Sequence, residues 1–246
     1  MLMLAAPISV SVTSNIAEVA RKFGRAGRSV VPISTAKALT FSAQAAQDAI
    51  KANMRDVFDR PTDFTLNATY VKPATVASME ANVYLKQFAG RVSADRYLLP
   101  EIDGGSRRQK SSERSLSPLM RGFKFAIPAD LVPRDGYGNV PGKVFTQILS
   151  QLKVSSDPLQ NQTARSKRRG KAAGRDEYFI PPPGSPLRAG VWKRMGRNVV
   201  PVLIFADHAN YKARLDFYGL GMRVARDTFP IKFEEQMSRE LARALA

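Results

Sequence analysis

The chain has 246 residues, of which 44% are hydrophobic, so it can bury one large core or two small ones and is not disordered throughout. Lys and Arg outnumber Asp and Glu by 38 to 21, and the net charge of +17 favours polyanions or acidic protein surfaces as partners. The absence of cysteine and the single histidine exclude disulfides, thiolate chemistry and metal sites built from several histidines.

The N-terminal part is predicted to contain a strand over residues 7–13, where apolar and polar residues alternate, and then a short helix that Asn15 can cap. The clearest element is a helix from about Ser34 to Phe58, which Ser34 or Thr35 can cap and Pro61 ends. Its apolar residues recur every three or four positions and therefore share one face. They are Leu39, Ala43, Ala46, Ile50, Met54 and Val57.

Two alternating runs after this helix, Phe64–Val71 and Met79–Leu85, predict an antiparallel β-hairpin. The segment between them, Lys72–Thr75, contains Pro73 and is typical of a turn.

Residues 104–175 differ in character, with fifteen Lys and Arg residues, four acidic residues and frequent Pro and Gly. This composition predicts a long irregular insertion with a strand at Phe123–Ile127 and a helix at Lys143–Leu152. We expect too few apolar residues here for an independent core.

Three strands are predicted next, at Glu177–Ile180, Val191–Met195 and Val199–Ala206, with a tight turn at Arg197-Asn198. A helix from about Tyr211 to Ala246 ends the chain. Within it, Pro230 either kinks the helix or begins a new one that Thr228 caps.

The order of these elements predicts an α+β fold. A mainly antiparallel sheet packs against the long Ala-rich helix and the C-terminal helix. We expect a single domain over residues 1–246, with the irregular basic insertion at about 104–175. Because no apolar run approaches about 18 residues, we expect no membrane span.

The basic segment suggests a contact site for a polyanion or an acidic partner. Its candidate residues are Arg107, Arg108, Lys110, Arg165, Lys167, Arg168, Arg169, Lys171 and Arg175. The run from Arg165 to Lys171 fits a solvated flexible loop, a nucleic-acid contact or a contact with an acidic neighbouring subunit. Aromatic residues are not interleaved with the run, so any nucleic-acid contact would be directed at the backbone.

Catalytic residues are not indicated. His208 follows Asp207 at a strand end, which is more typical of a surface histidine than of a general base. Asp59, Asp63 and Glu80 are the least implausible carboxylates for a nuclease or hydrolase, but Asp59 and Asp63 fit pairing with Arg55 and Arg60 or capping of backbone amides better. We therefore expect no enzyme activity, no metal and no cofactor.

Several blocks of the sequence resemble a family of tailed-phage and prophage virion proteins, the minor tail or tail-completion proteins. The blocks are Val57–Asn67, Tyr70–Thr75, Arg96–Pro100, Gly104–Arg108, Tyr137–Asn139, Gln147–Ser150, Phe217-Tyr218, Thr228–Pro230 and Phe233. More distantly, the long Ala-rich helix, the hairpin and the C-terminal helix are similar to the minor tail protein Z group of lambda-like phages.

The resemblance implies a non-enzymatic structural protein of the virion, at the head–tail junction in the neck or upper tail, assembled in the cytoplasm of the bacterial host. It would form a homo-oligomeric ring that joins the connector to the tail. Its partners would be further copies of itself, portal, connector or adaptor proteins, tail terminator or tail tube proteins, and viral DNA. The alternative function is a nucleic-acid-binding packaging or DNA-retention factor that contacts the phosphate backbone.

Overall fold

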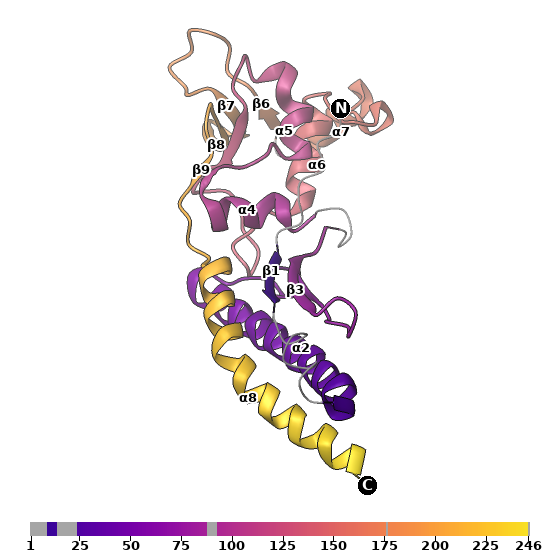
Figure 1. Cartoon of the computed structure of the whole chain (residues 1–246). Helices are drawn as coiled ribbons and strands as arrows, with labels where there is room; N and C mark the ends of the chain where they lie inside the picture. Colours follow the sequence, from indigo (N-terminus) through magenta and orange to yellow (C-terminus); the bar gives the residue numbers. More distant parts are fainter. Residues whose placement is uncertain (1–8, 14–23, 88–92, 176, 246) are drawn as a thin grey trace. The chain divides into compact units, whose positions relative to one another are not determined.

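The computed structural model describes residues 9–13, 24–87, 93–175 and 177–245. The chain forms two compact units (Figure 1). Unit 1 consists of Met1–Gly104 and Lys212–Ala246, and unit 2 is the intervening Gly105–Tyr211. The fold class expected from the sequence is confirmed, because long N- and C-terminal helices pack on antiparallel sheets.

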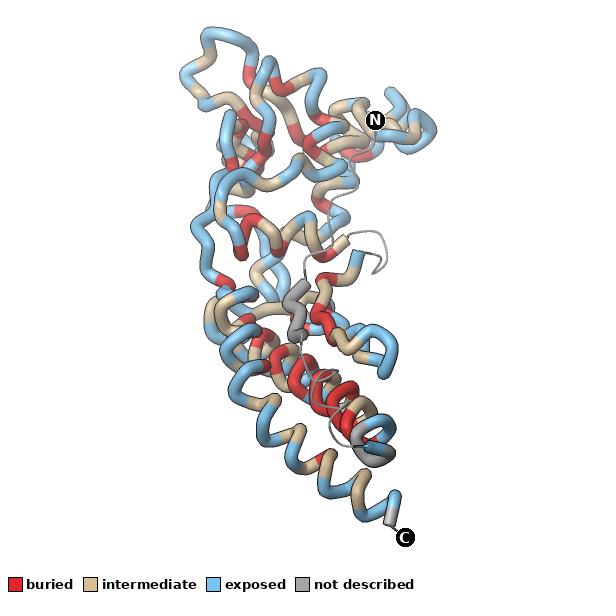
Figure 2. Tube along the Cα trace, in the orientation of Figure 1, coloured by how far each residue is buried: buried red, intermediate tan, exposed pale blue. Residues whose placement is uncertain are grey.

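Two long antiparallel helices, α2 (Gly24–Val57) and α8 (Phe217–Leu245), dominate unit 1. The predicted apolar face of α2 is confirmed, since Leu39, Ile50 and Met54 are fully buried. Figure 2 shows this face as a buried stripe along the helix. Phe217 at the start of α8 lies in the same core.

Helix α2 begins ten residues before the predicted start at Ser34, and Pro32 lies inside it. Ser34 and Thr35 are buried interior residues rather than caps. The Thr35 hydroxyl donates to the Val31 carbonyl at 2.8 Å, which satisfies it within the helix. Thr35, which favours a cap in sequence, is therefore accommodated inside the helix by a bond to the preceding turn, whereas the buried Ser34 hydroxyl has no hydrogen-bond partner among the described residues.

The predicted hairpin is confirmed in part. Strands β1 (Ser9–Thr13), β2 (Thr69–Lys72) and β3 (Glu80–Leu85) form an antiparallel sheet in the order β1-β3-β2. Tyr70 pairs with Tyr84 in its register. The sheet places Ala81, Val83 and Leu85 in the core.

The beginning of the first predicted hairpin strand is wrong. Asp63–Leu66 forms the short helix α3, because the Thr62 hydroxyl caps it by accepting a hydrogen bond from the Thr65 amide at 3.2 Å. Phe64 is exposed, so the alternation around it did not reflect burial. The short helix expected after Asn15 lies outside the described residues.

Helix α4 (Asp95–Asp103), which was not predicted from the sequence, completes unit 1 and buries Leu98 and Ile102 in its core. The carbonyl of Glu101 accepts hydrogen bonds from the amides of Arg214 and Leu215. The Arg214 guanidinium also pairs with the Glu101 carboxylate at 2.8 Å. These contacts tie the chain leaving unit 1 to the chain returning to it.

Unit 2 is built around a four-stranded antiparallel sheet in the order β5-β8-β7-β6. The strands are β5 (Phe125–Pro128), β6 (Glu177–Phe179), β7 (Gly190–Met195) and β8 (Asn198–Ala206). Strands β4 (Gly105–Ser106) and β9 (Asn210–Tyr211) pair with each other at the two ends of the unit.

Two positions of this sheet favour glycine, one for its backbone conformation and one for lack of space. The β7–β8 turn is Gly196-Arg197, one residue earlier than predicted, because Gly196 adopts a positive φ of 60° and Asn198 already pairs with Met195. At Gly190, a Cβ atom would lie 2.2 Å from the Leu203 carbonyl oxygen, so a side chain cannot be accommodated.

Both edge strands of this sheet donate a backbone hydrogen bond to a side chain. The Ala126 amide of β5 donates to Glu113, and the Tyr178 amide of β6 donates to Gln151. These two amides are therefore unavailable for pairing with an added strand.

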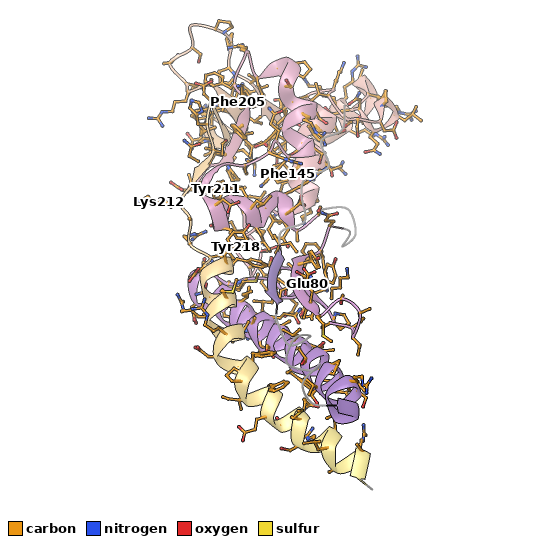
Figure 3. All side chains as sticks on the ribbon, in the orientation of Figure 1. Glu80, Phe145, Phe205, Tyr211, Lys212 and Tyr218 are labelled. Carbon is orange, nitrogen blue, oxygen red and sulfur yellow. The ribbon has the colours of Figure 1, made fainter. Side chains whose placement is uncertain are left out.

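The segment 104–175 carries more regular structure than the predicted irregular insertion. It contains α5 (Ser111–Leu116), η1 (Ser117–Leu119), α6 (Gly142–Gln151), η2 (Pro158–Gln160) and α7 (Ala164–Ala172), besides β5. Its core residues, such as Leu116 and Ile148, pack with Val191, Leu203 and Phe205 of the later strands. Phe205 of β8 lies in this core and Phe145 of α6 packs against it (Figure 3).

The inserted unit is thus Gly105–Tyr211, not 104–175. The core residues of 104–175 belong to one cluster with residues of β7 and β8, so this segment does not form a core by itself. The charge pattern of residues 104–175 predicted a basic surface. The core of the unit also needs the apolar strands β7 and β8, which follow this segment in the chain.

The C-terminal helix starts later than predicted and contains Pro230 as an interior residue of one continuous element. No new helix begins at Thr228, so that alternative is wrong. No described helix is long and apolar enough to cross a membrane.

Candidate polyanion interface

Six of the nine predicted contact residues lie on helix α7 or directly after it. Thr163 caps its first turn by accepting a hydrogen bond from the Ser166 amide at 3.2 Å. At the other end, the Gly174 amide donates to the Lys171 carbonyl and the Arg175 amide donates to the Gly170 carbonyl. Gly174 has a positive φ of 63°. This pair of bonds is a Schellman motif, which ends a helix at glycine.

The run Arg165–Lys171 is therefore a capped helix rather than the flexible loop that the sequence left open. The signals for it were present, since Thr163 and Gly174 bracket the run as cap residues. The density of positive charge obscured them, because a helix of like charges is intrinsically unfavourable.

One face of α7 carries Arg165, Arg168 and Arg169, spaced three and four residues apart and all exposed. No described carboxylate lies within ion-pair distance of these three guanidinium groups. Gly170 is the buried residue of the helix. The arginine face therefore points away from the core.

The opposite side of α7 is partly neutralised by one carboxylate. Glu177 of β6 lies 3.4 Å from Lys167 and 3.8 Å from Arg194 of β7. Arg194 also lies over the Phe179 ring at 5.3 Å. Glu177 thus links α7 to the β6–β7 edge, while Lys171 and Arg175 are exposed.

Arg107 must be withdrawn from the predicted contact set. Its side chain is only 9% exposed and binds both oxygens of Glu113, at 2.7 and 2.5 Å. Its guanidinium also lies 5.1 Å from the centre of the Phe125 ring. Arg107 is a structural residue of unit 2, whereas Arg108 and Lys110 remain exposed.

The electrostatics of this pair follow from its contacts. Burial alone would raise the pKa of Glu113, but hydrogen bonds from Arg107 and from the Ala126 and Lys110 amides hold this pKa below its ordinary value. The hydrogen bond to Glu113 raises the pKa of Arg107. Both groups therefore remain charged at neutral pH.

The structure does not bring the two predicted basic segments together by direct bonds. Within the described ranges, no hydrogen bond or ion pair links Arg107–Lys110 to Arg165–Arg175. The α7 segment is accordingly the candidate interface, and Arg108 and Lys110 are separate surface cations.

Two of the three carboxylates considered for catalysis have partners of their own in the structure. Asp59 pairs with Arg60 at 3.0 Å, as the sequence suggested, and this hydrogen bond lowers the pKa of Asp59. Glu80 accepts a hydrogen bond from Asn82 at 3.0 Å, while Asp63 and His208 are exposed. The described residues contain no cluster of three or more His, Cys, Asp or Glu side chains that could hold a metal ion.

Comparisons with protein-family models, curated proteins and solved structures gave no match to this chain.

Proposed function

We propose that this chain is a non-enzymatic structural subunit of a tailed-phage virion, which forms a homo-oligomeric ring at the head–tail junction and joins the connector to the tail. Two lines support the proposal: the resemblance of its sequence blocks to tail-completion proteins, and the apolar surface that unit 1 leaves exposed.

The exposed apolar side chains of α8 are the observation that carries self-association. Ile231 is 66% exposed, and Tyr218 and Met222, one turn apart, are exposed on the opposite side of the same helix. Beyond its first turns, α8 is largely intermediate or exposed in Figure 2. Apolar side chains in such positions gain free energy when a further surface covers them.

We assign these two sides of α8 to contacts with further copies of the chain. A ring subunit needs two lateral interfaces, and a long helix pair with apolar residues outside its core supplies surface for them. The edge amides of Ala126 and Tyr178 are already bonded, so the four-stranded sheet is not the expected route of association.

The first experiment measures the mass of the purified chain by native mass spectrometry or mass photometry. We expect an oligomer, which Ile231→Glu with Met222→Glu should convert to monomers, because buried unpaired carboxylates destabilise an apolar interface. The matched control is Ala52→Glu with Ala77→Glu, two exposed uncharged positions of unit 1 outside α8 that receive the same charge, and it should leave the oligomer intact.

Electron microscopy of assembled particles tests the location. Density for this chain between the connector and the tail is expected. A chain that is monomeric at high concentration and absent from mature particles would contradict the proposal.

A second candidate function is a packaging or DNA-retention factor. The exposed arginine face of α7 favours it, because this face lacks described counter-charges. A monomeric chain with strong DNA affinity would favour this candidate over the ring.

A further inference from the structure

Four of the six acidic residues that the structure describes in unit 2 are already bonded to cations or backbone amides of the same unit, which leaves its positive charge in excess. Glu113 is held by Arg107, and Glu177 contacts Lys167 and Arg194. Asp135 and Asp157 accept hydrogen bonds from nearby backbone amides. Unit 2 contains 19 Lys and Arg residues and 7 acidic residues, so its net charge is +12.

Helix α7 holds the densest part of this excess in a fixed geometry. Arg165, Arg168 and Arg169 are neighbours at positions i, i+3 and i+4, where like charges destabilise an isolated helix by about 0.2–0.5 kcal/mol per pair. The Thr163 cap and the Schellman motif at Gly174 hold the helix despite this repulsion. The three guanidinium groups are thus displayed together before any ligand binds.

The surroundings of α7 indicate which polyanion fits. Phe179 is covered by Arg194, and Trp192 is only partly exposed on β7, with its indole N–H bonded to the Arg188 carbonyl at 2.9 Å. Tyr178 is buried. Without exposed rings beside the arginines, unpaired bases have nothing to stack on, which disfavours single strands as the ligand.

We infer that the face of α7 formed by Arg165, Arg168 and Arg169 binds the phosphate backbone of duplex DNA without reading its sequence. A duplex carries one negative charge per about 1.7 Å of its axis, and arginine forks bind phosphate oxygens bidentately. Such a ligand can neutralise all three guanidinium groups at once. This inference does not depend on the ring, and it assigns the site that the DNA-binding alternative would need.

The test measures binding of the full chain to a 30-base-pair duplex of mixed sequence, by fluorescence anisotropy between 50 and 300 mM salt. Arg165→Gln, Arg168→Gln and Arg169→Gln are combined in one variant, since glutamine keeps helix propensity and removes charge. We expect the slope of log affinity against log salt to fall by about 2–3, and the affinity at 100 mM salt to fall at least about tenfold.

The control variant combines Lys124→Gln, Lys143→Gln and Lys153→Gln, which removes the same charge from exposed positions of unit 2 outside α7. It should keep most of the affinity and slope. Circular dichroism of both variants should match the unchanged chain.

Three outcomes would overturn the inference. They are an equal loss in the control variant, tighter binding to single-stranded oligo-dT than to duplex, and affinity for poly-glutamate as high as for DNA. The last result would identify an acidic protein as the partner. Loss of DNA binding with an intact oligomer would leave the ring proposal standing.

Discussion

At the scale of single residues, Glu113 is the most constrained polar group of unit 2. Its carboxylate accepts hydrogen bonds from Arg107, from the Lys110 amide and from the Ala126 amide. The carboxylate therefore joins the start of α5 to the edge strand β5. The side chains of Glu113 and Arg107 are 2% and 9% exposed, so each needs the other as a buried counter-charge.

Removing this carboxylate should destabilise unit 2. In Glu113→Ala, the Arg107 guanidinium and the Ala126 amide lose their partner, and the free energy of unfolding should fall by about 3–5 kcal/mol. Chemical denaturation followed by circular dichroism measures the change. Asp59→Ala, which removes an exposed ion pair with Arg60, is the control and should leave the midpoint unchanged.

The same pair predicts a dependence on pH. The pKa of Glu113 is lower in the folded chain than its ordinary value of 4.5, so its contribution to stability is complete above that value. The contribution is lost as the pH falls towards the lowered pKa. Between pH 6 and 3, the unchanged chain should lose stability more steeply than Glu113→Gln, and parallel curves would contradict this.

At the scale of elements, α7 shows a conflict between local stability and surface charge. Arg168 has Arg165 three residues before it and Lys171 three residues after it, so both helix neighbours repel it. A helix optimised only for folding would place an acidic residue here.

Arg168→Glu should therefore stabilise α7 while weakening DNA binding. Two repulsive pairs become attractive, each by a few tenths of a kcal/mol. Hydrogen exchange of the α7 amides should slow or stay unchanged, and duplex affinity should fall. Faster exchange with unchanged affinity would show that the arginine serves the fold instead.

The elements also show where sequence patterns succeeded. The face of α2 that contains Leu39, Ile50 and Met54 follows from helical spacing alone, and all three residues are buried. The pattern failed at Phe64, where the Thr62 cap favoured a helical turn over a strand. It also missed α7, because a run of like charges is unfavourable for an isolated helix and hid the cap signals at Thr163 and Gly174.

At the scale of the whole molecule, unit 2 is inserted into unit 1 with its two ends adjacent. Gly105 pairs with Tyr211 and Ser106 with Asn210, so the unit closes on itself. Its core, from Leu116 and Ile148 to Val191 and Leu203, is separate from that of unit 1. An insertion with these properties can fold alone.

Residues 105–211 expressed by themselves should therefore fold. We expect a cooperative thermal transition and dispersed amide resonances, with the arginine face of α7 still able to bind duplex DNA. Removing β7 and β8 as well, by ending the fragment at residue 175, should abolish folding because the core loses Val191, Leu203 and Phe205. A folded 105–175 fragment would contradict this.

The sequence by itself determined the α+β class, the buried face of α2, the pairing of β2 with β3 and the concentration of positive charge before residue 175. These features follow from local periodicity and composition. Only the tertiary structure decided that the basic segment shares a core with β7 and β8, that Arg107 is buried against Glu113, and that three arginines of α7 form one exposed face. The reason is that core membership and ion pairing depend on residues distant in the chain, which spacing and composition do not encode.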